Sequence, residues 1–135
     1  MNVALLSIGD ELLSGNTVNT NFSWIARKLS DFGCSIIYQA TIPDNESSIK
    51  ITLDRLLTMA PEMIITTGGL GPTSDDITRK TIFDFLSISE KFDKNYWGQL
   101  KNKFYQMGIQ ISESNRSQAM VPHRGHIIKN PLGSA

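Results

Sequence analysis

Hydrophobic residues occur either in continuous runs or at every third or fourth position along the chain. The alternation of these two patterns predicts three strand–helix units. A continuous apolar run near the N-terminus is typical of a strand that is covered on both faces. Two similar runs predict further strands, so strands are expected at 3–8, 34–42 and 62–66. Apolar residues then recur every three or four positions, so helices are expected at 22–32, 49–60 and 77–85. Strands that alternate with helices predict an α/β fold with a parallel sheet and right-handed crossovers.

The pattern weakens in the last third of the chain. Apolar positions from Phe92 to Met107 predict one more helix, ended by Gly108, and residues 115–120 predict a helical turn. His126-Ile127-Ile128 predicts a short strand. This segment resembles an insertion that packs on the edge of the sheet or takes part in oligomer contacts.

Length and composition indicate one ordinary globular domain spanning 1–135. The 135 residues are enough for one core, and 40% of them are hydrophobic. Thirteen basic and thirteen acidic residues cancel, so we expect neither a nucleic-acid partner nor a membrane partner. The single cysteine, Cys34, is compatible with a reducing cytoplasm and is interpreted as a small core residue. No run reaches membrane-spanning length, and the first apolar run lacks the basic flank of a signal peptide. We therefore expect a cytoplasmic protein.

The most informative stretch is TTGGLGPTSDD, residues 66–76. A strand that breaks into nearly adjacent glycines and restarts as a helix presents backbone N–H groups to an anion, usually phosphate. Asp75 and Asp76 at the helix start would repel a bare phosphate, but they fit a divalent cation placed between them and the phosphate oxygens. The stretch is neither a Walker A loop nor a dinucleotide fingerprint, because the required Lys and third glycine are missing.

Acidic residues follow all three predicted strands. The carboxyl ends of parallel strands open on one edge of the sheet, and the loops at 9–15, 41–45 and 67–76 leave from there. These loops carry Asp10, Glu11, Asp44, Asp75 and Asp76. Carboxylates gathered near a glycine loop repel one another unless a cation or a proton intervenes. We therefore predict a divalent metal, Mg²⁺ or a similar hard ion, held by few protein oxygens plus substrate phosphates.

Each of these acids also has a structural alternative. Asp76 and Thr73 could form a capping box, and Asp44 could cap the second helix. Asp10 and Glu11 could form a solvated turn, and Asp75 could be a first-turn helix acid. His123 and His126 lack further ligands nearby in sequence, so a surface position is favoured over a metal site.

Taken together, the motifs resemble the N-terminal domain of the CinA (competence/damage-inducible) family. The matching segments are residues 8–15 (IGDELLSG), 19–21 (NTN), 66–78 (TTGGLGPTSDDIT) and 130–135 (NPLGSA), with Asn115, Gln118, Ala119 and Pro122. The domain belongs to the MogA/MoaB-like molybdopterin-binding superfamily. The resemblance implies a three-layer α/β sandwich with a mostly parallel sheet, and homodimers or homotrimers.

The resemblance also implies an activity and a set of site residues. CinA-type domains resemble metal-dependent pyrophosphatases that split ADP-ribose or similar nucleotide diphosphates into AMP and a sugar phosphate. The superfamily's catalytic and metal-binding acids fall on Asp44, Asp76 and Glu11, with Asp10 as a further metal candidate. Positions for substrate and phosphate binding fall on Thr66, Thr67, Gly68, Gly69, Gly71, Pro72, Thr73, Asn19, Asn130, Gly133 and Ser134. The metal would be Mg, Mn or Co, and no organic cofactor is required. Turn stabilisation is the alternative role for Asn19, Thr67, Thr73 and Asn130.

Departures from the superfamily pattern leave other functions open. MogA-like proteins, which bind molybdopterin and adenylylate it, usually have Thr at the position of Leu70 and Arg at that of Asp75. Both differences favour the CinA branch.

Family members typically continue past the motif in which this chain stops, at Ala135, so the domain is expected to be truncated at its C-terminal end. The alternatives are a molybdopterin- or nucleotide-binding module of the molybdenum-cofactor type, with binding or adenylyl transfer, and an inactive remnant.

Overall fold

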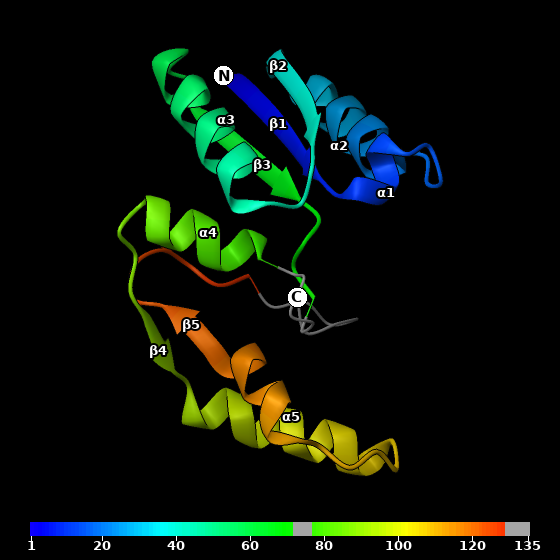
Figure 1. The fold of residues 1–135 in the computed structure, drawn as a ribbon, viewed down its shortest axis with the longest axis vertical. Coiled ribbons are helices and arrows are strands. Elements are labelled where there is room, and N and C mark those ends of the chain that lie inside the picture. The colour runs from blue at the N-terminus through cyan, green and yellow to red at the C-terminus, as the bar shows by residue number, and fades with distance from the viewer. Residues whose placement is uncertain (72–76, 129–135) are drawn as a thin grey trace. The chain divides into compact units, whose positions relative to one another are not determined.

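The computed structural model describes residues 1–71 and 77–128, which form two compact units (Figure 1). The first unit comprises residues 1–70 and 77–82. The second unit comprises residue 71 and residues 83–128. Pro72, Thr73, Asp75, Asp76, Asn130, Gly133 and Ser134 therefore lie outside the described residues.

A parallel sheet forms the centre of the first unit. Its strands are β1 (Asn2–Ile8), β2 (Ser35–Ile42) and β3 (Met63–Thr67), in the order β2-β1-β3. In the register, Leu6 of β1 lies between Ala40 of β2 and Thr66 of β3. All three strands run in one direction, so their carboxyl ends share one edge of the sheet. The expected α/β fold with a parallel sheet is confirmed.

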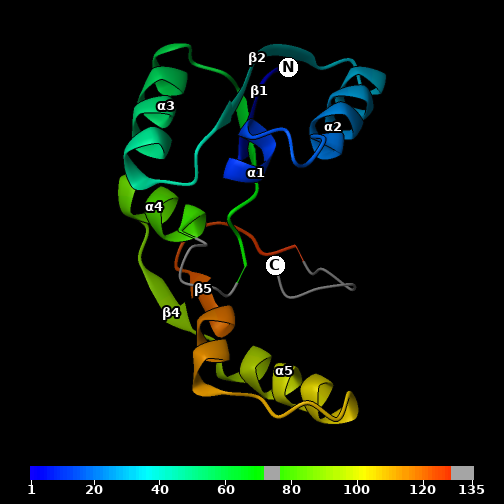
Figure 2. The same ribbon diagram turned by 45° about the vertical axis from the view of Figure 1, so that its right-hand side comes forward.

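Helices cover both faces of this sheet. α2 (Thr20–Asp31) and α3 (Glu46–Thr58) lie on opposite sides of the strands, which makes three layers (Figure 2). A short helix, α1 (Asp10–Leu13), follows β1 directly, and α4 (Thr78–Phe85) begins in the first unit. Along the part of the chain that the structure describes, every helix lacks the length and apolar character needed to cross a membrane.

The core lies around β1 and the inner face of α3. Residues 3–8 of β1 are almost completely buried, as the continuous apolar run predicts for a central strand. α3 contributes Ile49, Leu53 and Leu56, spaced one helical turn apart. Each such side chain contributes about 1.5–3 kcal/mol when it is withdrawn from water. The central strand and α3 therefore supply most of the stability of this unit.

The second unit is built from shorter elements. β4 (Glu90–Phe92) and β5 (Met120–Pro122) pair antiparallel, and α5 (Lys94–Gln106) and the 3₁₀ helix η1 (Glu113–Ala119) lie between them in sequence. Asp93 caps α5 by accepting hydrogen bonds from the backbone N–H groups of Asn95 and Tyr96. Leu100 and Ala119 are the buried apolar side chains among the described residues of this unit. This small core contrasts with that of the sheet.

Most predicted elements are present, and two predictions in the second unit are wrong. The helix expected after residue 90 is α5, and the expected helical turn is η1. Residues 126–128 are not in a strand, whereas Met120–Pro122 is. A three-residue strand is stabilised by its hydrogen-bonded partner strand, here by the pairing of Phe92 with Met120. Such a short strand shows no hydrophobic period in the sequence. Phe92 was expected at the start of the helix but belongs to β4, because it pairs with β5.

Candidate functional site

The loops that leave the three parallel strands meet at the carboxyl edge of the sheet. The backbone N–H of Gly9, after β1, donates to the carbonyl oxygen of Ile42 at the end of β2 (3.1 Å). Gly68, after β3, has a φ of +93°, and a Cβ on it would collide with the carbonyl oxygen of Ile8. A side chain at position 68 would therefore push the β3 loop away from β1.

Asp44 lies against Gly69 at this edge. Gly69 has a φ of +58°, and a Cβ there would lie 2.8 Å from Oδ2 and 3.1 Å from Oδ1 of Asp44. The same Cβ would come closer still to Oγ1 of Thr78, at the start of α4. The backbone N–H of Thr78 also donates to the carbonyl oxygen of Gly69 (3.2 Å). The structure thus brings a carboxylate, a hydroxyl and a glycine turn together from three separate segments.

The alternative role for Asp44 as a helix cap is wrong. The cap of α3 is Asn45, whose side chain accepts a hydrogen bond from the backbone N–H of Ser48 (2.9 Å). Asp44 precedes the cap and is half-buried. Its carboxylate is directed toward the glycine turn after β3.

Asp10 and Glu11 form the first turn of α1, and both are exposed. The carboxylate of Glu11 folds back over Gly9, because a Cβ on Gly9 would lie 2.5 Å and 2.6 Å from its two oxygens. The backbone carbonyl of Glu11 accepts from the N–H of Thr17 (3.1 Å), which ties the loop after α1 to this turn. Glu11 therefore lies at the carboxyl end of β1 with its carboxylate against the turn.

Asn19 has a structural role that its position explains. Its Oδ1 accepts from the backbone N–H of Phe22 (3.0 Å) and so caps α2, while its Nδ2 donates to Oγ of Ser7 (2.7 Å). Ser7 is buried near the end of β1. Turn stabilisation, the alternative weighed from the sequence, is thus observed for Asn19.

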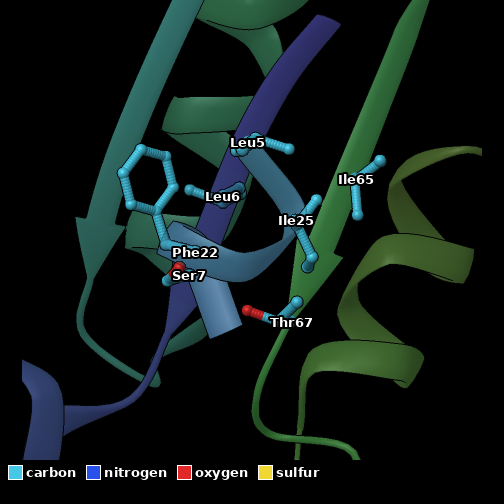
Figure 3. Close-up of a pocket in the computed structure, with 7 residues that line it drawn as sticks. All are labelled: Leu5, Leu6, Ser7, Phe22, Ile25, Ile65 and Thr67. Carbon is cyan, nitrogen blue, oxygen red and sulfur yellow. The ribbon is translucent and has the colours of Figure 1, made fainter. Parts of the chain in front are cut away.

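A shallow hollow lies between α2 and the sheet (Figure 3). It is lined by Leu5, Leu6, Ser7, Phe22, Ile25, Ile65 and Thr67. The hollow leaves no room for a water molecule, so it cannot hold a nucleotide. Ser7 and Thr67 place two hydroxyls at its end.

The remaining predicted site residues fall into two groups. Thr66 and Thr67 end β3 and are half-buried, and Gly71 is an exposed residue of the second unit. Roles assigned to Pro72, Thr73, Asp75, Asp76, Asn130, Gly133 and Ser134 stay predictions, since these residues lie outside the described part of the chain.

Within residues 1–71 and 77–128, no group of three or more His, Cys, Asp or Glu side chains could hold a metal ion. His123 and His126 are exposed, as expected for surface positions.

Two residues of this edge escape sequence reasoning. Ser7 and Thr78 carry buried hydroxyls beside the predicted residues. Ser7 is the first polar residue after a continuous apolar run, a signal that could have indicated the strand end. Thr78 lies two positions after the predicted Asp-Asp pair. Only its burial in the fold distinguishes it from an ordinary helical threonine.

Comparison with known proteins defines the class to which this fold and edge belong. Residues 4–127 match the family described as "Probable molybdopterin binding domain", and the chain belongs to that family. The chain also resembles MoaB from Thermus thermophilus, with a TM-score of 0.56 and 25% identity over 62% of this chain and 53% of that one. This MoaB is described as a molybdopterin biosynthesis enzyme.

Within this class the similarity is to CinA proteins, which confirms the resemblance seen in the sequence. The structure of CinA from Thermoplasma acidophilum superposes with a TM-score of 0.84 and 27% identity, over 99% of this chain and 78% of that one. A CinA-like protein of Prochlorococcus marinus (strain MIT 9312) is 42% identical over 98% of this chain and 31% of its own length. A putative competence-damage inducible protein of Natranaerobius thermophilus is 35% identical over 97% of this chain and 32% of its own. The chain spans about a third of the length of the curated relatives it matches.

Proposed function

We propose that this domain is a metal-dependent nucleotide pyrophosphatase, which hydrolyses ADP-ribose or a similar nucleotide diphosphate to AMP and a sugar phosphate. The observation that carries the proposal is the position of the Asp44 carboxylate, whose Oδ2 lies 2.8 Å from where a Cβ on Gly69 would stand. An acid placed directly against a glycine turn suits a ligand that carries both phosphate and a cation.

The glycine turn would hold one phosphate group. Gly68 and Gly69 both have positive φ, and successive residues of this kind can direct their N–H groups toward a common anion. Neither position has room for a Cβ, because Ile8 crowds Gly68, and Asp44 and Thr78 crowd Gly69. Hydrogen bonds from fixed N–H groups stabilise charge that develops on the phosphate oxygens during cleavage.

The donors at this edge fit a hard divalent cation. Asp44 offers carboxylate oxygens beside the glycine turn. Magnesium is usually held by one or two carboxylates together with substrate phosphates, so a large protein cage is not required. Asp44 would be one ligand, and Asp76, Glu11 and Asp10 are the further candidates. When bound, such an ion polarises a phosphoryl oxygen and lowers the pKa of a water molecule.

A second function of a different class is binding of molybdopterin or a nucleotide, with or without adenylyl transfer. The description of the family and the similarity to MoaB favour it. Leu70 and Asp75 stand where MogA-like proteins usually have Thr and Arg, and this difference favours hydrolysis. Molybdopterin is a possible ligand of this domain under the binding function, and the hydrolysis requires no organic cofactor. The homodimer or homotrimer expected from the family stays a prediction.

The first test is a turnover assay with ADP-ribose and Mg²⁺, Mn²⁺ or Co²⁺, followed by chromatography for AMP. We expect AMP that disappears when a chelator is added. Asp44→Asn should lower the rate ~100-fold or more, the usual cost of removing a charged group that stabilises the transition state. Asp54→Asn is the matched control, because Asp54 is an exposed acid on α3 and should leave the rate unchanged.

Three results would contradict parts of the proposal. Full activity of Asp44→Asn would exclude the role given to Asp44. Activity that survives complete chelation would exclude the metal dependence. Tight binding of a nucleotide or of molybdopterin without any release of AMP would favour the binding function over hydrolysis.

A further inference from the structure

The hydroxyl of Thr78 is buried without an evident structural use. Thr78 is completely buried, and its Oγ1 has no hydrogen-bond partner among the residues that the structure describes. Burying a hydroxyl without a partner costs free energy, whereas an apolar group of the same shape would not.

The surroundings of this hydroxyl contain a strong acceptor. Oγ1 of Thr78 occupies the space beside Gly69 where a Cβ would otherwise stand, and Oδ2 of Asp44 lies 2.8 Å from the same point. The hydroxyl and the carboxylate therefore both border the same point beside Gly69. The backbone N–H of Thr78 fixes this arrangement, because it donates to the carbonyl oxygen of Gly69 (3.2 Å).

We propose that Thr78 is a positioning residue for Asp44. In the ligand-bound domain its hydroxyl donates a hydrogen bond to the Asp44 carboxylate and holds that carboxylate toward the phosphates of a nucleoside diphosphate. The class of ligand rests on the proposed function. A role in core packing alone does not explain the hydroxyl, since valine would fill the same space without burying a polar group.

The test compares Thr78→Val, which removes the hydroxyl at nearly constant shape, with Thr78→Ser, which keeps it. The probe is a nucleoside diphosphate whose bridging oxygen is replaced by methylene, titrated with Mg²⁺ by calorimetry, so that binding is measured without turnover. We expect Thr78→Val to bind about tenfold more weakly, as the loss of one hydrogen bond to a charged group predicts. Thr78→Ser should stay within about twofold of the wild type. Thr81→Val is the control, because Thr81 is a buried threonine about one turn further along α4.

Thermal unfolding separates positioning from packing. If Thr78 positions Asp44, Thr78→Val should unfold at or above the wild-type temperature although it binds more weakly. Unchanged affinity of Thr78→Val would overturn the inference. A parallel loss of affinity and Tm would assign Thr78 to packing and overturn the inference as well.

The assay also distinguishes this inference from the proposed hydrolysis. A wild-type domain that binds the methylene analogue but releases no AMP from ADP-ribose would exclude hydrolysis, and the Thr78 variants would still decide the positioning role. A domain that cleaves ADP-ribose equally well with valine at position 78 would exclude the positioning role and leave the hydrolysis standing. A wild-type domain that does not bind the analogue would overturn both.

Discussion

The turns at the carboxyl edge of the sheet and those of the second unit are held by different means. At the edge, Gly68 packs against the carbonyl of Ile8, and Gly69 packs against Asp44. In the second unit, Gly108 and Gly125 also have positive φ, but nothing lies within 4 Å of where their Cβ atoms would be. The edge glycines are therefore fixed by contacts with other segments, whereas the second-unit glycines serve their own turns.

This difference shows why the edge suits a functional site. A site needs its groups held closely, and contacts between segments hold them better than a local turn does. Asp44 and Thr78 come from segments that are far apart in the sequence, and both reach the space beside Gly69. The space beside Gly108 and Gly125 is open, so a Cβ there would meet no neighbouring segment.

Replacing Gly68 by alanine should give the largest effect. The new Cβ would collide with the Ile8 carbonyl, a backbone group that cannot move without disturbing β1, and φ is +93°. We expect a loss of about 3 kcal/mol or more in the free energy of unfolding, measured by chemical denaturation. Gly108→Ala is the matched control from the second unit and should lose about 1 kcal/mol, since φ is +69° but the space is open. Equal losses for the two variants would remove the distinction between the regions.

Asn19 offers an intermediate test at the same edge. Asn19→Ala removes both the cap of α2 and the hydrogen bond to Ser7, so we expect a loss of about 1.5–2.5 kcal/mol in the free energy of unfolding. Asn45 caps α3 with one hydrogen bond to Ser48, and Asn45→Ala should lose about 1 kcal/mol. A loss for Asn19→Ala no greater than that for Asn45→Ala would mean that the contact with Ser7 contributes nothing.

Sequence patterns predicted the long elements of the first unit because each carries a strong period. Residues 3–6 and 8 are apolar, and Ile49, Leu53 and Leu56 repeat at helical spacing, so burial in the fold follows the pattern directly. α1, with four residues, and β4 and β5, with three each, are too short to show a period. Their formation depends on contacts between segments, such as the Gly9–Ile42 hydrogen bond at the edge.

The sequence could predict those features of the candidate site that follow from a parallel sheet. Parallel strands place their carboxyl ends at one edge, so Asp44 and the glycine turn are expected at the same edge. β1 lies between β2 and β3, so the close contact of Asp44 with Gly69 does not follow from the strand order. The sequence did not indicate that Asn45 rather than Asp44 caps α3, because either residue type can cap a helix. Nor could it indicate the buried Thr78 hydroxyl, since burial of a helical threonine depends on what packs over it.

The smallest expected effect tests how the second unit holds its own elements. The guanidinium of Arg116 lies 4.2 Å from the ring centroid of Phe92, and it also lies 3.8 Å from the Glu113 carboxylate. Arg116→Ala should lose about 0.5–1 kcal/mol in the free energy of unfolding through the ring contact. Glu113→Ala should change it by less than about 0.5 kcal/mol, because both members of this ion pair are more than half exposed. Chemical denaturation of both variants at low and high salt would separate the contributions, since salt screens the ion pair more than the ring contact. If Arg116→Ala and Glu113→Ala lose the same amount at low salt and nothing at high salt, Arg116 contributes to stability through the ion pair within η1 and not through the ring of Phe92.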